Sequence, residues 1–137
     1  MQKYYMVTFV NMYVAGIHAG IQSAHAISRL QLRARVGRHQ NALETWDVTS
    51  PTILVKNGKS SDNMHRLAVK LEELACAIDM PMAVWHEPDL DNAMTAIAIL
   101  VPASIVEYEG NAEQIYSPFS EEEYALMKLL RTYHLAR

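Results

Sequence analysis

Cysteine is nearly absent from this 137-residue chain. Its single cysteine, Cys76, excludes an internal disulfide bond and a zinc site built from several cysteines. Long apolar runs are missing as well. The longest, Ala96 to Val101, is far shorter than the roughly 20 residues that a membrane-spanning helix needs. The N-terminus lacks the cationic head and apolar stretch of a signal peptide, so we expect a cytoplasmic protein that does not enter a membrane.

Several catalytic signatures are also absent. The sequence has no glycine-rich phosphate loop, no nucleophile elbow and no HExxH motif. We expect no cofactor and no metal. A metal site joining His18, His25 and His86 stays an alternative that no spacing requires.

The composition is that of one globular domain spanning residues 1–137. Half of the chain is hydrophobic and 20% is charged, which is too apolar for a disordered protein. The net charge of −3 is unevenly spread. Arg29 to His39 holds four arginines and no acid, whereas Glu107 to Glu123 holds six glutamates and no base. The basic segment can meet an anion that the acidic segment would repel.

Strands and helices alternate along the chain. Aromatic, β-branched or continuous apolar runs predict strands, whereas apolar residues at a period near 3.6 predict helices. The expected strands are 4–10, 52–56, 82–85 and 94–101, and the expected helices are 17–33, from Ser60, Ser61 or Asp62 to 78, and about 119–135. Residues 36–41 are expected to form a loop, followed by one helical turn at 42–47 that Trp46 fixes to the core.

This order predicts an α/β fold with helices on both faces of the sheet. The short polar loop from His86 to Asn92 joins the last two strands, so we expect them to pair antiparallel in a mixed four-stranded sheet. Residues 103–137 form an extension whose apolar last helix either covers an edge of the sheet within the chain or builds an oligomer interface.

One polar stripe stands out on the first helix. His18, Gln22, His25 and Arg29 are spaced so that all four share one face. The opposite stripe (Ile17, Ile21, Ala24, Ile27 or Ser28, and Leu32) is expected to face the sheet. The polar stripe is either a solvated face or a site at the end of the sheet, where helix N-termini favour anions.

The loop after the third strand is the second candidate. His86, Glu87, Asp89 and Asp91 bunch three carboxylates with an imidazole, and carboxylates this close raise one another's pKa. The loop is either an acidic surface turn or a source of acid/base groups.

These residues resemble those of a known family. The strand YYMVTFV followed by GIHAGIQSAHA is similar to the opening of the type 2 peptidyl-tRNA hydrolases, with Gln22, His25 and Ala26 on matching positions. Trp46, the strand ending at Lys56 and the later blocks at 80–81 and 101–102 follow the family's order. The resemblance covers residues 4–102 and leaves 103–137 without a counterpart.

The resemblance implies a mixed four-stranded sheet, a homodimer, no cofactor, and hydrolysis of the ester between peptide and tRNA. The family's catalytic lysine is replaced here by His18, Glu87 falls on the family's aspartate, and Thr95 approximates its threonine. The expected catalytic residues are thus His18, Glu87, Gln22 and His25. The expected substrate-binding residues, among them an arginine cluster that would grip tRNA phosphates, are Arg29, Arg33, Arg35, Arg38, Lys56, Asp89 and Thr95.

Two functions remain open from the sequence. In the first, His18 and Glu87 form an acid/base pair that hydrolyses peptidyl-tRNA, and Gln22 or helix N–H groups hold the oxyanion. In the second, the chain is a binding module for a nucleotide-like or other anionic small molecule, without turnover. Both depend on His18 and Glu87 sharing one cavity.

Overall fold

The computed structural model describes residues 2–110 and 118–136. The described part contains four strands, five α-helices and one short 3-10 helix. In chain order they are β1 (Tyr4–Val10), α1 (Ile17–Arg33), α2 (Gly37–Thr49), β2 (Ile53–Asn57), α3 (Ser61–Ile78), β3 (Met82–Glu87), η1 (Pro88–Leu90), β4 (Ala93–Pro102), α4 (Ala103–Val106) and α5 (Glu121–Arg131). None of the described helices has the length and apolarity needed to cross a membrane.

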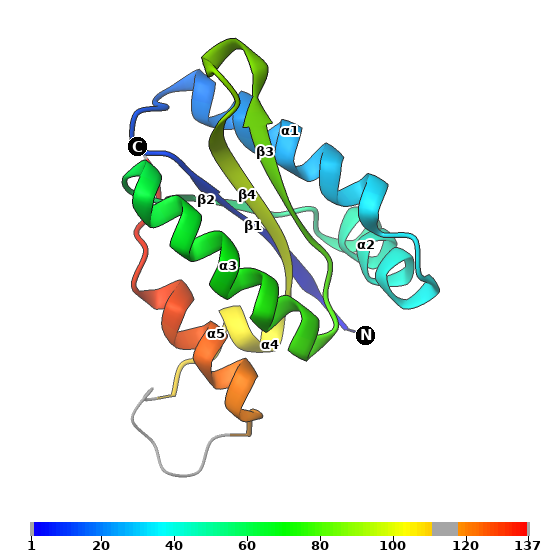
Figure 1. The fold of residues 1–137 in the computed structure, drawn as a ribbon. Coiled ribbons are helices and arrows are strands. Elements are labelled where there is room, and N and C mark those ends of the chain that lie inside the picture. The colour runs from blue at the N-terminus through cyan, green and yellow to red at the C-terminus, as the bar shows by residue number, and fades with distance from the viewer. Residues whose placement is uncertain (1, 111–117, 137) are drawn as a thin grey trace.

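The four strands form one mixed sheet in the order β2-β1-β4-β3 (Figure 1). β1 pairs parallel with β2, while β4 pairs antiparallel with both β1 and β3. The α/β class, the mixed sheet and the antiparallel β3–β4 pair predicted from the sequence are confirmed.

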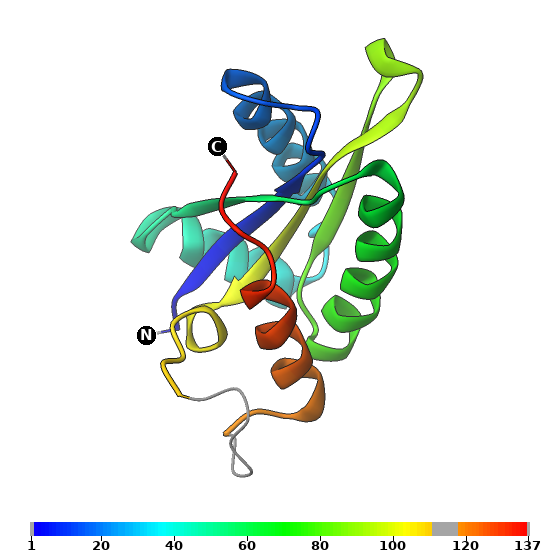
Figure 2. The same cartoon turned by 90° about the vertical axis from the view of Figure 1, so that its left-hand side faces the viewer.

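Helices cover both faces of the sheet (Figure 2). One face carries Met6, Val10 and Leu100 beneath α1 and α2. The other face carries Phe9 and Ile99, which pack with side chains of α3, α4 and α5. Side chains of β1 and β4 alternate between these two cores, which explains why both strands read as near-continuous apolar runs.

The buried face of α1 differs from the predicted one. The helix buries mainly small residues, Ala19, Ser23, Ala26, Ile27 and Leu30. Ile17 and Leu32, which were expected to face the sheet, are 76% and 57% exposed. Small side chains let α1 lie close to the strands, so the larger apolar residues remain outside. The prediction for this stripe was therefore wrong, except at Ile27.

Helix α2 is longer than predicted. It begins at Gly37 and runs to Thr49, so the loop expected at 36–41 is mostly helical. Trp46 anchors it as expected: the side chain is 5% exposed and its indole N–H donates a 2.9 Å hydrogen bond to the Thr52 carbonyl. Its first turns consist mostly of polar residues, so hydrophobic periodicity does not predict a helix there.

The C-terminal extension is part of the core. Leu126, Met127 and Leu130 of α5 are buried beside α3, so the helix covers the sheet face within the chain. A capping box between Ser120 and Glu123 starts α5. The helix ends at Arg131, earlier than predicted, and residues 111–117 lie outside the described part of the chain.

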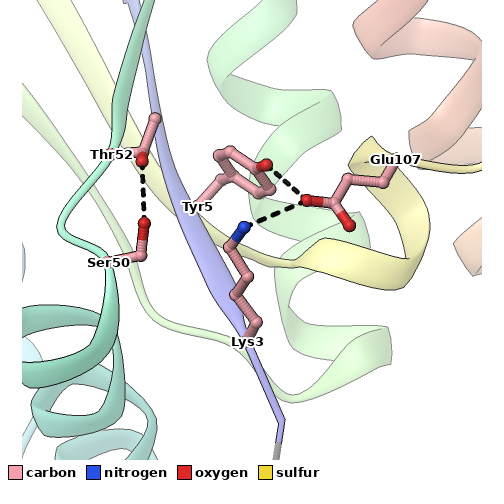
Figure 3. Close-up of polar contacts among 5 residues, drawn as sticks. All are labelled: Lys3, Tyr5, Ser50, Thr52 and Glu107. Carbon is pink, nitrogen blue, oxygen red and sulfur yellow. Dashed lines mark hydrogen bonds and ion pairs between the residues drawn. The ribbon is translucent and has the colours of Figure 1, made fainter.

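Polar contacts tie the start of β1 to the extension (Figure 3). Both the Tyr5 hydroxyl and the Lys3 ammonium donate hydrogen bonds to Oε1 of Glu107, just after α4. This carboxylate raises the pKa of Lys3 and of Tyr5, and their hydrogen bonds lower the pKa of Glu107. The hydroxyls of Ser50 and Thr52 lie 3.2 Å apart on the other side of β1, ahead of β2.

Candidate functional site

A cluster of polar and aromatic side chains lies between α1 and the β3–β4 hairpin. It consists of Gln22, His25, Trp85, Glu87 and Thr95 and is called the Glu87 site below. Three separate elements supply it: α1, β3 and β4. The polar stripe of α1 therefore faces the hairpin at Gln22 and His25, and is not simply a solvated face.

Two residues of β3 form one side of the site. Trp85 and Glu87 are two positions apart, which places them on the same face of a strand. The indole N–H of Trp85 donates a 2.8 Å hydrogen bond to Oε2 of Glu87. β3 extends two residues beyond the predicted end at Trp85, and this extension gives Glu87 a strand position in place of the loop position expected from the sequence.

A bulge brings Thr95 into the site. Trp85 pairs with Ala96, but the next residue, His86, pairs with Met94, so Thr95 is an extra residue in β4. Bulges redirect side chains and are frequent beside active sites. Thr95 is only 2% exposed, and its hydroxyl donates a 2.5 Å hydrogen bond to Oε1 of Gln22.

That hydrogen bond orients the Gln22 amide. Because Oε1 of Gln22 accepts from Thr95, its Nε2–H group is left to act as a donor toward Glu87. Hydrogen bonding by Trp85, and then by Gln22, lowers the pKa of Glu87 against the opposing effect of partial burial. The backbone at Asp89 and the charge of His25 act in the same direction. Glu87 is thus held as a carboxylate.

His25 and the neighbouring Arg29 both contact the Trp85 indole from α1. The His25 ring stacks on the Trp85 indole with centroids 4.7 Å apart and planes 19° apart. One turn later, the Arg29 guanidinium lies 5.3 Å from the centre of the same indole. The site therefore combines a carboxylate, an imidazole, an amide and a cation on a rigid aromatic support.

His18 was expected to form a pair with Glu87. It occupies the exposed first turn of α1, one turn before Gln22 on the same face. Within the described residues, no hydrogen bond or ion pair joins His18 to Glu87, and the imidazole whose charge acts on this carboxylate is that of His25.

The arginine cluster divides into two groups. Arg29 and Arg33 are exposed on α1, and Arg35 is exposed just beyond it, where its Nε–H donates to the Leu32 carbonyl. Arg38 lies on α2 and forms an ion pair with Asp79 at the end of α3. This ion pair occupies the Arg38 guanidinium at the end of α3.

Of two further residues expected to bind substrate, Lys56 lies away from the Glu87 site, whereas Asp89 adjoins it. The Lys56 ammonium donates to the carbonyls of Leu130 and Tyr133, at 3.1 and 2.9 Å. Burial lowers the pKa of Lys56. Asp89 is exposed in η1, beyond Glu87.

Trp85 is the member of the site that sequence reasoning missed. It was assigned only as the end of a strand. The available signal was its position two residues before Glu87, which puts both side chains on one face if the strand continues. Among the described residues, no three His, Cys, Asp or Glu side chains come together as a metal site, so His18, His25 and His86 do not form one.

Comparisons with known proteins do not identify a family for this chain. No protein-family model matches the chain, and none of the curated proteins matches it. An ionised carboxylate beside an imidazole can take a proton from water and return one to a leaving group, which is the minimum for hydrolysis.

Proposed function

We propose that the chain hydrolyses the ester that joins a peptide to tRNA, as a divergent relative of the type 2 peptidyl-tRNA hydrolases. The observation that carries this proposal is the contact chain from Thr95 through Gln22 to Glu87. Gln22 lies in the segment that resembles the family's helix, while Glu87 and Thr95 fall at or near its aspartate and threonine. These separate segments of sequence converge at one place.

The site supports a reaction with two proton transfers. Glu87, ionised at neutral pH, takes a proton from a water molecule as the water oxygen attacks the ester carbonyl carbon. The N–H group of the Gln22 amide stabilises the oxyanion. The bond to the ribose oxygen then breaks, and protonated His25 gives that oxygen its proton. His18, exposed in the first turn of α1, contacts the substrate.

The tRNA is proposed to lie along α1. Arg29, Arg33 and Arg35 are exposed at one end of this helix, and phosphate binding requires several cations that act together. Such a substrate would place the protein in the cytoplasm. We also propose a homodimer, supported by exposed apolar side chains of α1 and β2, with Ile17 at 76% and Ile53 at 44% exposure.

The decisive experiment is hydrolysis of an N-acetylated aminoacyl-tRNA by the purified protein. We expect Glu87→Gln, which keeps the shape of the side chain, to lower kcat by about 100-fold or more. Glu44→Gln on the exposed side of α2 is the matched control and should leave the rate unchanged. A wild-type rate equal to that of buffer, or full activity of Glu87→Gln, would contradict the proposal.

The second candidate function is a binding module without turnover. The observation in its favour is that His18 stands where the family has a lysine, and that it makes no contact with Glu87. Binding of a nucleotide such as AMP, weakened by Arg29→Met and accompanied by no ester hydrolysis, would select this function over the first.

A further inference from the structure

A cavity lies between the β1–α1 connection and the chain after α5. It has a volume of about 410 Å³ and is lined by three segments: the β1–α1 connection, the β2–α3 loop and the chain after α5. Both ribbon views place the C-terminal end next to the β1–α1 connection (Figures 1 and 2). The volume is in the range of small-molecule sites.

The chain after α5 forms a fixed wall of this cavity. The Asn57 N–H donates to the His134 carbonyl at 2.9 Å, and the Ala136 N–H donates to the Val55 carbonyl at 2.8 Å. The C-terminal residues thus bind the free edge of β2 as a short antiparallel segment. Lys56 strengthens the attachment through its hydrogen bonds to the carbonyls of Leu130 and Tyr133. The C-terminal extension therefore supplies one wall of the cavity.

The β2–α3 loop forms a second fixed wall. The Gly58 N–H donates to the Val10 carbonyl at 2.7 Å, and the Met12 N–H donates to the Lys59 carbonyl at 2.9 Å. A Cβ atom at Gly58 would lie 2.2 Å from Sδ of Met64, so only glycine fits this close approach. The cavity is thus largely formed before any ligand enters.

The lining combines apolar side chains with four polar or basic ones, Asn11, Asn57, Lys59 and His134. Met12 and Leu135 are large apolar residues that are 49% and 61% exposed on two different walls. Lys59 lies at the rim, with its ammonium 4.8 Å from the centre of the Tyr133 ring. Asn57 adds an amide whose Oδ1 already accepts the Lys59 N–H, which leaves its N–H groups as donors. None of the described residues that line the cavity carries a carboxylate.

We infer that this cavity binds a small organic monocarboxylate with an apolar body. One lysine, with His134 and amide donors beside it, matches one carboxylate, whereas a phosphate is held by several convergent cations. The exposed apolar side chains on two walls would be covered by the body of the ligand, which favours binding through the area removed from water.

The cavity is distinct from the Glu87 site although the two are neighbours. The Asn11 N–H donates to the Thr95 carbonyl at 3.0 Å, so the start of the β1–α1 connection separates them. Asn11 lines the cavity, whereas Gln22, Glu87 and Thr95 do not. Binding there does not depend on whether the chain hydrolyses an ester.

Calorimetric titration of the full chain with N-acetyl-leucine tests the inference. N-acetyl-leucinamide has the same apolar body without the negative charge. We expect the acid to bind with a Kd of about 1 mM or lower, and the amide to bind at least about 10-fold more weakly. Lys59→Met keeps the aliphatic stem and should weaken acid binding by about 10-fold. Lys70→Met on the exposed face of α3 is the matched control and should bind as the wild type does.

Two additional variants test whether the acid binds in this cavity and whether its binding is independent of the Glu87 site. Ala15→Phe, on the β1–α1 connection, should fill the cavity and reduce binding of the acid. Glu87→Gln should bind the acid as the wild type does, so loss of ester hydrolysis and loss of carboxylate binding are separate results. The inference is overturned if the acid fails to bind at about 10 mM, if acid and amide bind equally, or if a folded Lys59→Met protein binds normally.

Discussion

The indole N–H of Trp85 donates a 2.8 Å hydrogen bond to Oε2 of Glu87, two residues further along β3. The same indole stacks against His25 of α1, so one aromatic side chain orients both the carboxylate and the imidazole. This arrangement holds the proposed acid/base groups on a strand and a helix, which are more rigid than loops.

Trp85→Phe should raise the pKa of Glu87 toward the ordinary value of a glutamate, because the hydrogen bond that contributes most to lowering it is lost. Glu87 acts as a base only when ionised, so the acidic limb of the pH–rate profile for ester hydrolysis should move to higher pH. At neutral pH the rate should change by no more than about 10-fold, since Glu87 stays ionised.

The measurement is the pH dependence of kcat, or a direct NMR titration of the Glu87 carboxyl. Trp46→Phe serves as the matched control because its indole donates to the Thr52 carbonyl beside α2 and not to the site. An unchanged acidic limb in Trp85→Phe together with a shifted limb in Trp46→Phe would contradict the assigned role of Trp85.

Buried hydroxyls between β1 and α1 give a prediction about stability. Thr8 is fully buried, Ser23 is 3% exposed, and their oxygens lie 2.9 Å apart. Thr8→Val leaves the Ser23 hydroxyl without this partner, so the free energy of unfolding should fall by about 1–3 kcal/mol. Adding Ser23→Ala should recover part of the loss, because neither polar group then remains.

Urea unfolding of the two single variants and the double variant measures the coupling between these hydroxyls. Additive losses in the double variant would show that the pair does not interact. A favourable coupling would support the close approach of α1 to the sheet, which also positions Gln22 and His25.

Much of the fold follows from the sequence because apolar residues recur with a strand or helix period. β1 (Tyr4–Val10) and α1 (Ile17–Arg33) have the predicted bounds. The buried face of α1 could not be predicted in this way, since hydrophobicity ranks Ile17 above Ala19 and Ala26. Small residues form the buried face because α1 lies close to the sheet.

The site was predicted in part. Gln22, His25, Glu87 and Thr95 were all candidates, and the structure brings them together. The pairing of His18 with Glu87 stays a prediction that no contact supports. Thr95 reaches α1 through a bulge, and a bulge breaks the strand alternation on which sequence patterns rely. The contact between Trp85 and Glu87 forms because β3 continues past its predicted end.

Lys56 is expected to stabilise the chain after α5. Lys56→Met keeps the aliphatic stem but removes the donors to the Leu130 and Tyr133 carbonyls. The free energy of unfolding should fall by about 1–2 kcal/mol. Amide exchange should also become faster at Ala136, whose N–H is bound to the Val55 carbonyl. Lys128→Met, on an exposed face of α5, is the control and should change neither quantity. Unchanged exchange in Lys56→Met would contradict this role.

Asp79, the residue that follows α3, links this helix to α2 through its charged side chain. It has a left-handed backbone (φ 58°), forms an ion pair with Arg38, and shares a 3.0 Å hydrogen bond with Nε2 of His39. Asparagine tolerates this backbone, so Asp79→Asn removes the charge with little strain. We expect Tm at pH 7 to fall by about 1–3 °C, because ion pairs this exposed contribute little.

This loss of stability should depend on pH in a defined direction. The Arg38 hydrogen bond, followed by that of His39, lowers the pKa of Asp79 in the folded protein. A carboxyl whose pKa is lower in the folded state stabilises the protein above its unfolded pKa, and this contribution is lost as pH falls through the folded pKa. The difference in Tm between the wild type and Asp79→Asn should therefore disappear in acid. Asp47→Asn on α2 is the control, and a difference that persists unchanged in acid would show that the charge of Asp79 is not its cause.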